Sequence, residues 1–333
     1  MTSLLMMPLL TSVMPPLATA FASAGVSALF PVALLSAALV VAVGVAATKI
    51  QWAEKVWNPT TGCVRVSLGC QLCYMFSDVE NRLQYNVHGK YAHGTELTLH
   101  PHTLADMVDD TSPAKVFVNS MSDLFHEAVP DEYIFEVFEH MALAPWHLYM
   151  ILTKRDERLR ELGPSLPWAD HVLMGVTVEN HANIHRLSAL RACGASRTFV
   201  SFEPLIGSVV GPNGVLDLSG IDYAIAGGES AKYTNDERRI RKPIPMQEEW
   251  ATQIRDACAE QDVAFHFKQW GAFNKAGVQV GAKDAGRELQ GRTYDEEPAW
   301  YESFMARSEV LAAAARVSRG PGKAPVQESD SEL

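Results

Sequence analysis

The sequence has few cysteines for its length, with five in 333 residues. An odd number in a chain long enough to bury a sizeable core argues against a framework of disulfide bonds. Three of the five fall within residues 63–73, whereas Cys193 and Cys258 stand alone. The pattern favours a reducing compartment and one metal site, with Cys193 and Cys258 as buried structural thiols.

Positive charge is also scarce. The chain has 28 Lys and Arg residues against 39 Asp and Glu residues, which gives a net charge of −11. This balance argues against a general binder of polyanions. A basic run at 238–242 keeps a nucleic-acid hypothesis open, but a solvated loop is the simpler interpretation of that run.

No charged residue and no histidine occurs before Lys49. A cleaved signal peptide would need a positively charged n-region, which residues 1–48 lack. Residues 25–47 are long and apolar enough to anchor the chain in a membrane, and Lys49 and Lys55 would then keep the main domain cytoplasmic. The other hypothesis is that the segment arises from a mis-called start and that translation begins near Val45. Both hypotheses predict a cytoplasmic main domain.

Short apolar, β-branched runs recur through the body of the chain, as expected of parallel strands buried on both faces. Helical patterns, such as 131–144 and 247–261, alternate with them at the spacing of βα units. The expected strands are 116–118, 149–152, 172–176, 198–200, 223–226 and 264–267. This alternation predicts an α/β fold with a full or partial (β/α) barrel, a single catalytic domain over 49–306. Residues 307–333 have little to bury and are expected to form a mostly disordered tail.

A polar cluster follows each expected strand. Ligands bind at the carboxyl ends of the strands in parallel α/β folds, so these clusters are expected to converge on one pocket. Helix caps and turns are the alternative explanation, but they suit the charged members less well. The candidate catalytic residues are Asp123, Lys154, Glu179, Glu203, Glu229 and Lys268.

Cys63, Cys70 and Cys73 have the spacing C-x6-C-x2-C, with a glycine before each of the first two. Thiolates close together in such a loop can hold zinc or an iron–sulfur cluster. A structural zinc site needs four ligands, so one histidine from 88, 93, 100 or 102 would have to join. Those histidines are better explained as a polar surface loop. Three cysteines without a fourth ligand favour a [4Fe–4S] cluster with one open iron.

Several motifs in a fixed order carry a family resemblance. Besides the cysteine loop, they are Val-Asn-Ser-Met-Ser-Asp-Leu-Phe-His (118–126), Leu-Thr-Lys-Arg (152–155), Val-Glu-Asn (178–180), Phe-Glu-Pro-Leu (202–205), Gly-Gly-Glu-Ser (227–230) and Phe-Lys-Gln-Trp-Gly (267–271). On these motifs, residues 49–298 resemble the phage-associated three-cysteine-motif family of unknown function, which is radical-SAM-like (SAM, S-adenosylmethionine). Members generally begin just before the equivalent of Lys49, which favours the mis-called start.

The resemblance implies a [4Fe–4S] cluster on Cys63, Cys70 and Cys73, a SAM cofactor and a separately encoded three-Cys-motif partner protein, but no particular substrate. It implies a radical SAM-type enzyme, in which one electron from the cluster cleaves SAM to a 5′-deoxyadenosyl radical. The rival hypothesis is a zinc-stabilised nucleic-acid-binding or adaptor module without catalysis. The usual radical SAM spacing is C-x3-C-x2-C, so the longer first gap is a departure.

Further cofactor-binding candidates follow from the same resemblance. The aromatic residue after the third cysteine resembles the one often found there in radical SAM enzymes, although a core aromatic is the simpler alternative. The segment after the first expected strand corresponds best to the SAM-binding turn. The Gly-Gly-Glu at 227–229 comes too late in the chain to match the glycine-rich SAM motif and is taken as a coincidence in detail. The cofactor-binding candidates are therefore Tyr74, Asn119, Ser120, Asp123, Ser201 and Glu203.

Overall fold

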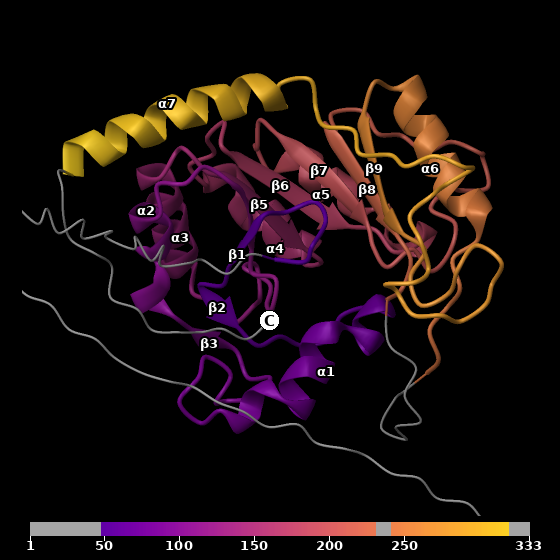
Figure 1. Cartoon of the computed structure of the whole chain (residues 1–333), viewed down its shortest axis with the longest axis horizontal. Helices are drawn as coiled ribbons and strands as arrows, with labels where there is room; N and C mark the ends of the chain where they lie inside the picture. The colour runs from indigo at the N-terminus through magenta and orange to yellow at the C-terminus, as the bar shows by residue number, and fades with distance from the viewer. Residues whose placement is uncertain (1–47, 231–240, 320–333) are drawn as a thin grey trace, which may run out of the picture. The chain divides into compact units, whose positions relative to one another are not determined.

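A computed structural model describes residues 48–230 and 241–319. Its centre is a seven-stranded sheet in the order β1-β4-β5-β6-β7-β8-β9, with every neighbouring pair parallel. The strands are β1 (Lys55–Trp57), β4 (Lys115–Val118), β5 (Leu148–Thr153), β6 (Val172–Thr177), β7 (Thr198–Phe202), β8 (Tyr223–Gly227) and β9 (Ala264–Gln269). All six strands expected from the sequence are confirmed. The sheet curls into a partial (β/α) barrel (Figure 1), with β1 and β9 as its edges.

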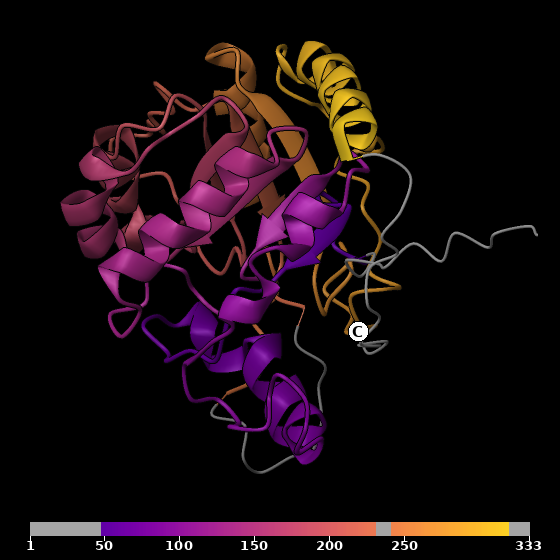
Figure 2. The same ribbon diagram turned by 90° about the vertical axis from the view of Figure 1, so that its left-hand side faces the viewer.

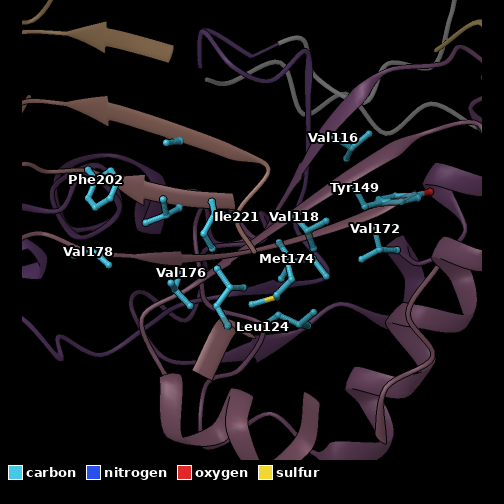
Figure 3. Close-up of a cluster of buried hydrophobic side chains, with 14 of the residues drawn as sticks. Val116, Val118, Leu124, Tyr149, Val172, Met174, Val176, Val178, Phe202 and Ile221 are labelled. Atoms are coloured by element: carbon cyan, nitrogen blue, oxygen red, sulfur yellow. The ribbon is translucent and has the colours of Figure 1, made fainter. Parts of the chain in front are cut away.

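The two faces of the sheet bury alternate residues of the same strands. On one face, residues such as Val116, Tyr149 and Met174 join a large apolar cluster (Figure 3). On the other face, Phe117 and Phe199 belong to a second cluster. Because both faces are buried, the strands need no polar alternation, which explains their continuous hydrophobic runs.

The large cluster is completed by helices α3 (Asp131–Leu143), α4 (Asp156–Leu162), α5 (Arg186–Ala192) and α6 (Glu248–Glu260), which contribute residues such as Ile134, Leu159 and Ile254. Figure 2 shows these helices layered outside the sheet. A shorter helix, α2 (Asp106–Asp109), packs against α3. The expected helices at 131–144 and 247–261 are confirmed.

Residues 58–103, between β1 and α2, form a separate layer near the carboxyl ends of the strands (Figures 1 and 2). It contains the short antiparallel pair β2 (Thr60–Thr61) and β3 (Thr98–Leu99), the helix α1 (Tyr74–Asn81) and three single 3₁₀ turns, Gly69–Leu72, Leu83–Tyr85 and Pro101–Thr103. Two further 3₁₀ turns, Gly163–Ser165 and His181–Asn183, follow α4 and β6. The cysteine loop therefore lies between β2 and α1.

Helix α7 (Tyr301–Arg319) lies at the opposite end of the sheet, the yellow helix of Figures 1 and 2. Arg316 donates to the carbonyl of Thr111 at 2.5 Å, in the loop that leads into β4. Phe304, Ser308 and Ala312 are buried at intervals of four residues. Helix α7 covers residues 307–319 of the segment expected to be a mostly disordered tail, and its small buried residues let it pack closely without a strongly apolar sequence.

Several hypotheses concern residues outside the described part of the chain. These are the membrane anchor or mis-called start (1–48), most of the basic run at 238–242, and residues 320–333 of the tail. Within residues 48–230 and 241–319, no helix combines the length and apolar character needed to cross a membrane.

Candidate functional site

The carboxyl ends of the strands surround a cavity of about 220 Å³. Its wall includes apolar side chains such as Trp52, Phe117 and Leu152, which come from the inner face of the sheet and from the segment before β1. Nearly all of the sequence-predicted site residues line it: Cys63, Cys70, Cys73, Tyr74, Asn119, Ser120, Asp123, Lys154, Ser201, Glu203, Glu229 and Lys268. Glu179 is the exception among them and is fully buried beside the cavity. The strand ends thus bring these residues together as expected, while their roles stay predictions.

The cysteine loop, residues 62–73, is built by backbone geometry. Gly62 has φ +83° and lies so close to the segment before β3 that a Cβ atom would be 2.0 Å from the Glu96 carbonyl oxygen. The Cys63 amide donates to the Thr95 carbonyl at 3.1 Å. The 3₁₀ turn Gly69–Leu72 then presents Cys70, and Cys73 ends the loop immediately before α1.

All three cysteines of the loop carry free thiols. Burial, with a smaller contribution from the Asp123 carboxylate, raises the pKa of Cys63 to about 12, although the Arg155 guanidinium acts in the opposite direction. Burial also raises the pKa of Cys73 above its ordinary value. Without a metal the thiols of Cys63 and Cys73 therefore hold their protons at neutral pH, and binding of a metal would release those protons.

Two cations from the end of β5 lie beside these thiols. Arg155 Nη2 is 3.8 Å from Cys63 Sγ and 3.3 Å from the Val64 carbonyl oxygen. Burial lowers the pKa of Lys154, but the neighbouring groups Cys70, Glu179 and Cys73 outweigh it and raise this pKa above its usual range. Positive charge at this position favours thiolates over thiols.

The carboxylate of Asp123 accepts four hydrogen bonds from neighbouring groups of the protein. It accepts from Thr153 Oγ1 at 2.7 Å and from the amide of Phe125 at 3.0 Å, and Arg155 Nη1 lies 3.1 Å away. The Lys154 amide completes the set at 3.1 Å. Asp123 therefore joins the loops after β4 and β5, and little of its capacity faces the cavity.

Glu203 and Lys268 form a different kind of pair. Lys268 Nζ lies 3.0 Å from Glu203 Oε1, and Trp52 Nε1 and Ser201 Oγ donate to the other oxygen at 3.2 and 3.3 Å. The side chain of Lys268 is 26% exposed and that of Glu203 is 14% exposed. In the part of the chain that the structure describes, neither side chain is hydrogen-bonded to the cysteine loop. This pair offers the cavity one cation and one anion from the ends of β9 and β7.

Asn119 and Ser120 use their side chains to bind the segment after β1. Asn119 adopts φ 60° and donates from Nδ2 to Thr60 Oγ1 at 2.9 Å, and Ser120 Oγ donates to Asn58 Oδ1 at 3.2 Å. The hydroxyl of Tyr74 donates to the Ser120 carbonyl. Tyr74 is 44% exposed, so it is a rim residue and not the core aromatic of the alternative interpretation.

Glu229 and Arg241 show a connection that sequence reasoning missed. Glu229 is 3% exposed, and the two oxygens of its carboxylate accept from Arg241 Nη2 at 2.5 Å and Nη1 at 2.7 Å. Arg241 belongs to the basic run that was expected to be a solvated loop. It is instead engaged inside the fold, and no local sequence signal distinguishes it from its basic neighbours.

The histidines between residues 88 and 102 are divided by the fold. His88, His93 and His102 are not buried, as expected of a surface loop. His100 is 5% exposed, and its Nε2 lies 2.8 Å from Thr61 Oγ1. This contact links the end of β3 to β2. The two lone cysteines, Cys193 and Cys258, are buried at 0% and 1% exposure, as predicted.

The thiols of the cysteine loop are the candidate metal ligands around the cavity. Within the described residues, no three His, Cys, Asp or Glu side chains stand close enough together to hold one metal ion. Three free thiols from one loop nevertheless face one cavity. A four-iron cluster bonds its thiolates to separate irons, so its ligands stand further apart than those of a single zinc ion.

Comparison with known proteins identifies the family. Residues 47–298 match the model of DUF5131, a protein of unknown function. The chain belongs to the DUF5131 family. The match has nearly the extent of the resemblance seen in the sequence, whereas the phage association stays a prediction. No curated protein matches this DUF5131 chain.

Among solved structures, the DUF5131 chain is similar to spore photoproduct lyases. A mutant with bound AdoMet and dinucleoside spore photoproduct has 13% identity and a TM-score of 0.40, over 66% of this chain and 76% of that chain. A lyase complexed with dinucleoside spore photoproduct has 13% identity and a TM-score of 0.35, over 80% and 76%. A likeness this distant transfers neither a ligand nor a reaction.

Proposed function

We propose that this protein is a radical SAM-type iron–sulfur enzyme, with a [4Fe–4S] cluster held by Cys63, Cys70 and Cys73. The observation that carries the proposal is that three free thiols of one loop line the cavity at the carboxyl ends of the parallel strands. In parallel α/β folds this is the end at which ligands bind. When bound, such a cluster supplies the electron that cleaves SAM to a 5′-deoxyadenosyl radical.

Other side chains around the cavity are proposed to supply charge beside the thiols, contacts for the ligands and an apolar wall. Lys154 and Arg155 place positive charge beside the thiols, which favours the thiolate form that a metal needs. Glu203 and Lys268 offer an anion and a cation to the polar groups of SAM or substrate. Trp52 and Phe117 supply an apolar wall that excludes water from the same cavity. These roles use side chains on rigid strand ends, which suits the positioning of reactive groups.

The experiment is a metal analysis of the full chain purified without oxygen. The proposal expects about four irons and four sulfides per chain. Cys70→Ala should lose them, and Cys258→Ala, which removes a buried thiol of helix α6 away from the cavity, should keep them. Formation of 5′-deoxyadenosine from SAM under reducing conditions would then test the reaction class.

A different result would identify the rival function. One zinc per chain and no iron would contradict the enzyme proposal and support the zinc-stabilised nucleic-acid-binding or adaptor module. The buried position of His100 makes it a poor fourth zinc ligand, because its Nε2 is already bonded to Thr61. The separately encoded three-Cys-motif partner belongs to the same proposal and is tested by co-purification with the tagged chain.

A further inference from the structure

Cys63 and Cys73 pack against a small apolar cluster, but the part of the cysteine loop between Cys63 and Cys70 has little apolar anchoring. Val64, Val66 and Leu68 are 53%, 44% and 41% exposed, so the long gap between Cys63 and Cys70 turns its aliphatic side chains toward solvent. Such a segment cannot be held by burial of apolar area. Its position must come from polar contacts with the sheet.

One contact is made by Arg241, whose five N–H donors are all used. Two donate to Glu229, at 2.5 and 2.7 Å, and one to the Lys242 carbonyl at 3.0 Å. The other two donate to the loop itself, to Gln71 Oε1 at 3.1 Å and to the Leu68 carbonyl at 3.1 Å. The guanidinium therefore joins both sides of Cys70 to the end of β8, a geometry that a lysine ammonium cannot reproduce.

A second contact comes from Glu179 at the end of β6. Its carboxylate is fully buried and accepts from Ser67 Oγ at 2.5 Å and from the Gly69 amide at 3.3 Å. Ser67 Oγ in turn lies 3.2 Å from Cys70 Sγ. Lys154 Nζ lies 3.9 Å from Oε1 of this carboxylate. The Glu179 carboxylate thus binds the cysteine loop and does not line the cavity.

We propose that Glu179 and Arg241 are positioning residues that hold Cys70 over the strand ends before any metal binds. The proposal deepens the proposed function and rests on it only for the identity of the metal group. It also reassigns two of the candidate catalytic residues, because Glu179 and Glu229 are both occupied in fastening the loop. Glu203 and Lys268 are then the charged pair left to face a ligand.

The test measures how fast iodoacetamide alkylates each cysteine in the full, metal-free chain, with the sites resolved by peptide mass spectrometry. Arg241→Gln is expected to accelerate alkylation of Cys70 by about tenfold, because the loop opens locally. Loss of a positive charge would by itself raise the thiol pKa and slow the reaction, so the sign separates position from charge. Arg241→Lys keeps the charge, loses the fork and is expected to accelerate alkylation as well.

The controls are built into the chain. Cys193 and Cys258 are buried elsewhere and should react at their wild-type rates. Arg158→Gln, which breaks an arginine pair with Asp131 outside the cavity, should leave Cys70 unchanged. An unchanged rate at Cys70 in both Arg241 variants would overturn the proposal. An equal rise at all buried cysteines would also overturn it, because the residue would then stabilise the whole fold.

Glu179→Gln is followed by hydrogen exchange, because removal of a negative charge alters thiol reactivity directly. Faster exchange of the amides in residues 67–73, with unchanged exchange in β8 and α6, is expected, whereas unchanged exchange in the loop would contradict the proposal. In protein reconstituted with iron and sulfide, Arg241→Lys should shift the electron paramagnetic resonance spectrum of the reduced cluster. A chain that binds no iron would defeat the proposed function and leave the alkylation and exchange results standing.

Discussion

Arg155 and Asp123 form a buried ion pair between the ends of β5 and β4. Arg155 Nη1 lies 3.1 Å from Asp123 Oδ2, and the two side chains are 3% and 7% exposed. Arg155 also reaches Glu127 at 3.0 Å and the carbonyl oxygen of Val64 in the cysteine loop at 3.3 Å. Asp123 thus holds the Arg155 guanidinium beside Cys63, so this predicted catalytic residue has a structural role.

Asp123→Ala is expected to destabilise the protein by ~3–5 kcal/mol, because it leaves the buried guanidinium with less compensating charge. Urea unfolding gives the difference in the free energy of unfolding. The matched control is Asp131→Ala, whose carboxylate is 55% exposed and pairs with Arg158 at 2.5 Å. An exposed pair contributes at most ~1 kcal/mol. Equal costs for the two substitutions would contradict the buried-pair interpretation.

Gly69→Ala is expected to displace the cysteine loop from the sheet. A Cβ atom at position 69 would lie 2.6 Å from Glu179 Oε1 and 2.8 Å from Pro204 Cγ, both of which are confined by the fold. Overpacking of this kind costs ~1–3 kcal/mol. Iron bound after anaerobic reconstitution should fall, together with the unfolding midpoint in urea.

Gly89→Ala provides the comparison for that substitution. Its Cβ atom would meet Asn86 Nδ2 at 2.8 Å, but Asn86 is an exposed side chain that can move aside. Iron content and stability should therefore stay near the wild-type values. If Gly69→Ala also kept both values, the close approach of Glu179 to the loop would be of no consequence.

The sheet could be predicted from the sequence because its strands are buried on both faces. Runs such as 149–152 and 172–176 are continuous in hydrophobicity, and that signal is local. Strand β1 was not predicted because it has only three residues, Lys55–Trp57. It pairs directly with β4, which lies more than 50 residues later in the sequence, after the cysteine loop. Helix α7 escaped because composition was a poor guide to a helix that packs through small residues.

The site was predictable to the extent that it follows from strand ends. The rule that ligands bind at the carboxyl ends of parallel strands placed Lys154, Glu203 and Lys268 around one cavity. The rule does not say which charged residues face the cavity and which are used inside the fold. That division depends on contacts such as Gln71 to Arg241, which are 170 residues apart and leave no local pattern.

His266 predicts an acid-sensitive contribution to stability. Burial lowers its pKa to about 4, with the Asp295 carboxylate acting in the opposite direction. The unfolded chain, with a pKa near ~6.5, binds more protons between those values, so the free energy of unfolding falls as the pH drops below ~6.5. From pH ~7.5 to pH ~5 the loss from this residue is about 2 kcal/mol. His266→Asn should flatten the pH profile by that amount, and parallel profiles for the two proteins would contradict the assignment.

Helix α7 is expected to be held mainly by Phe304. This side chain is 2% exposed, and the Arg197 guanidinium lies 5.4 Å from its ring. Phe304→Ala should lower the free energy of opening α7 by up to ~3–5 kcal/mol, whereas Val310→Ala, at a position 69% exposed, should change it by less than ~0.5 kcal/mol. Hydrogen exchange of residues 301–319 measures this opening. Rapid exchange throughout 307–319 in the unmodified protein would instead support the disordered tail that composition predicts, because only a packed helix protects these amides.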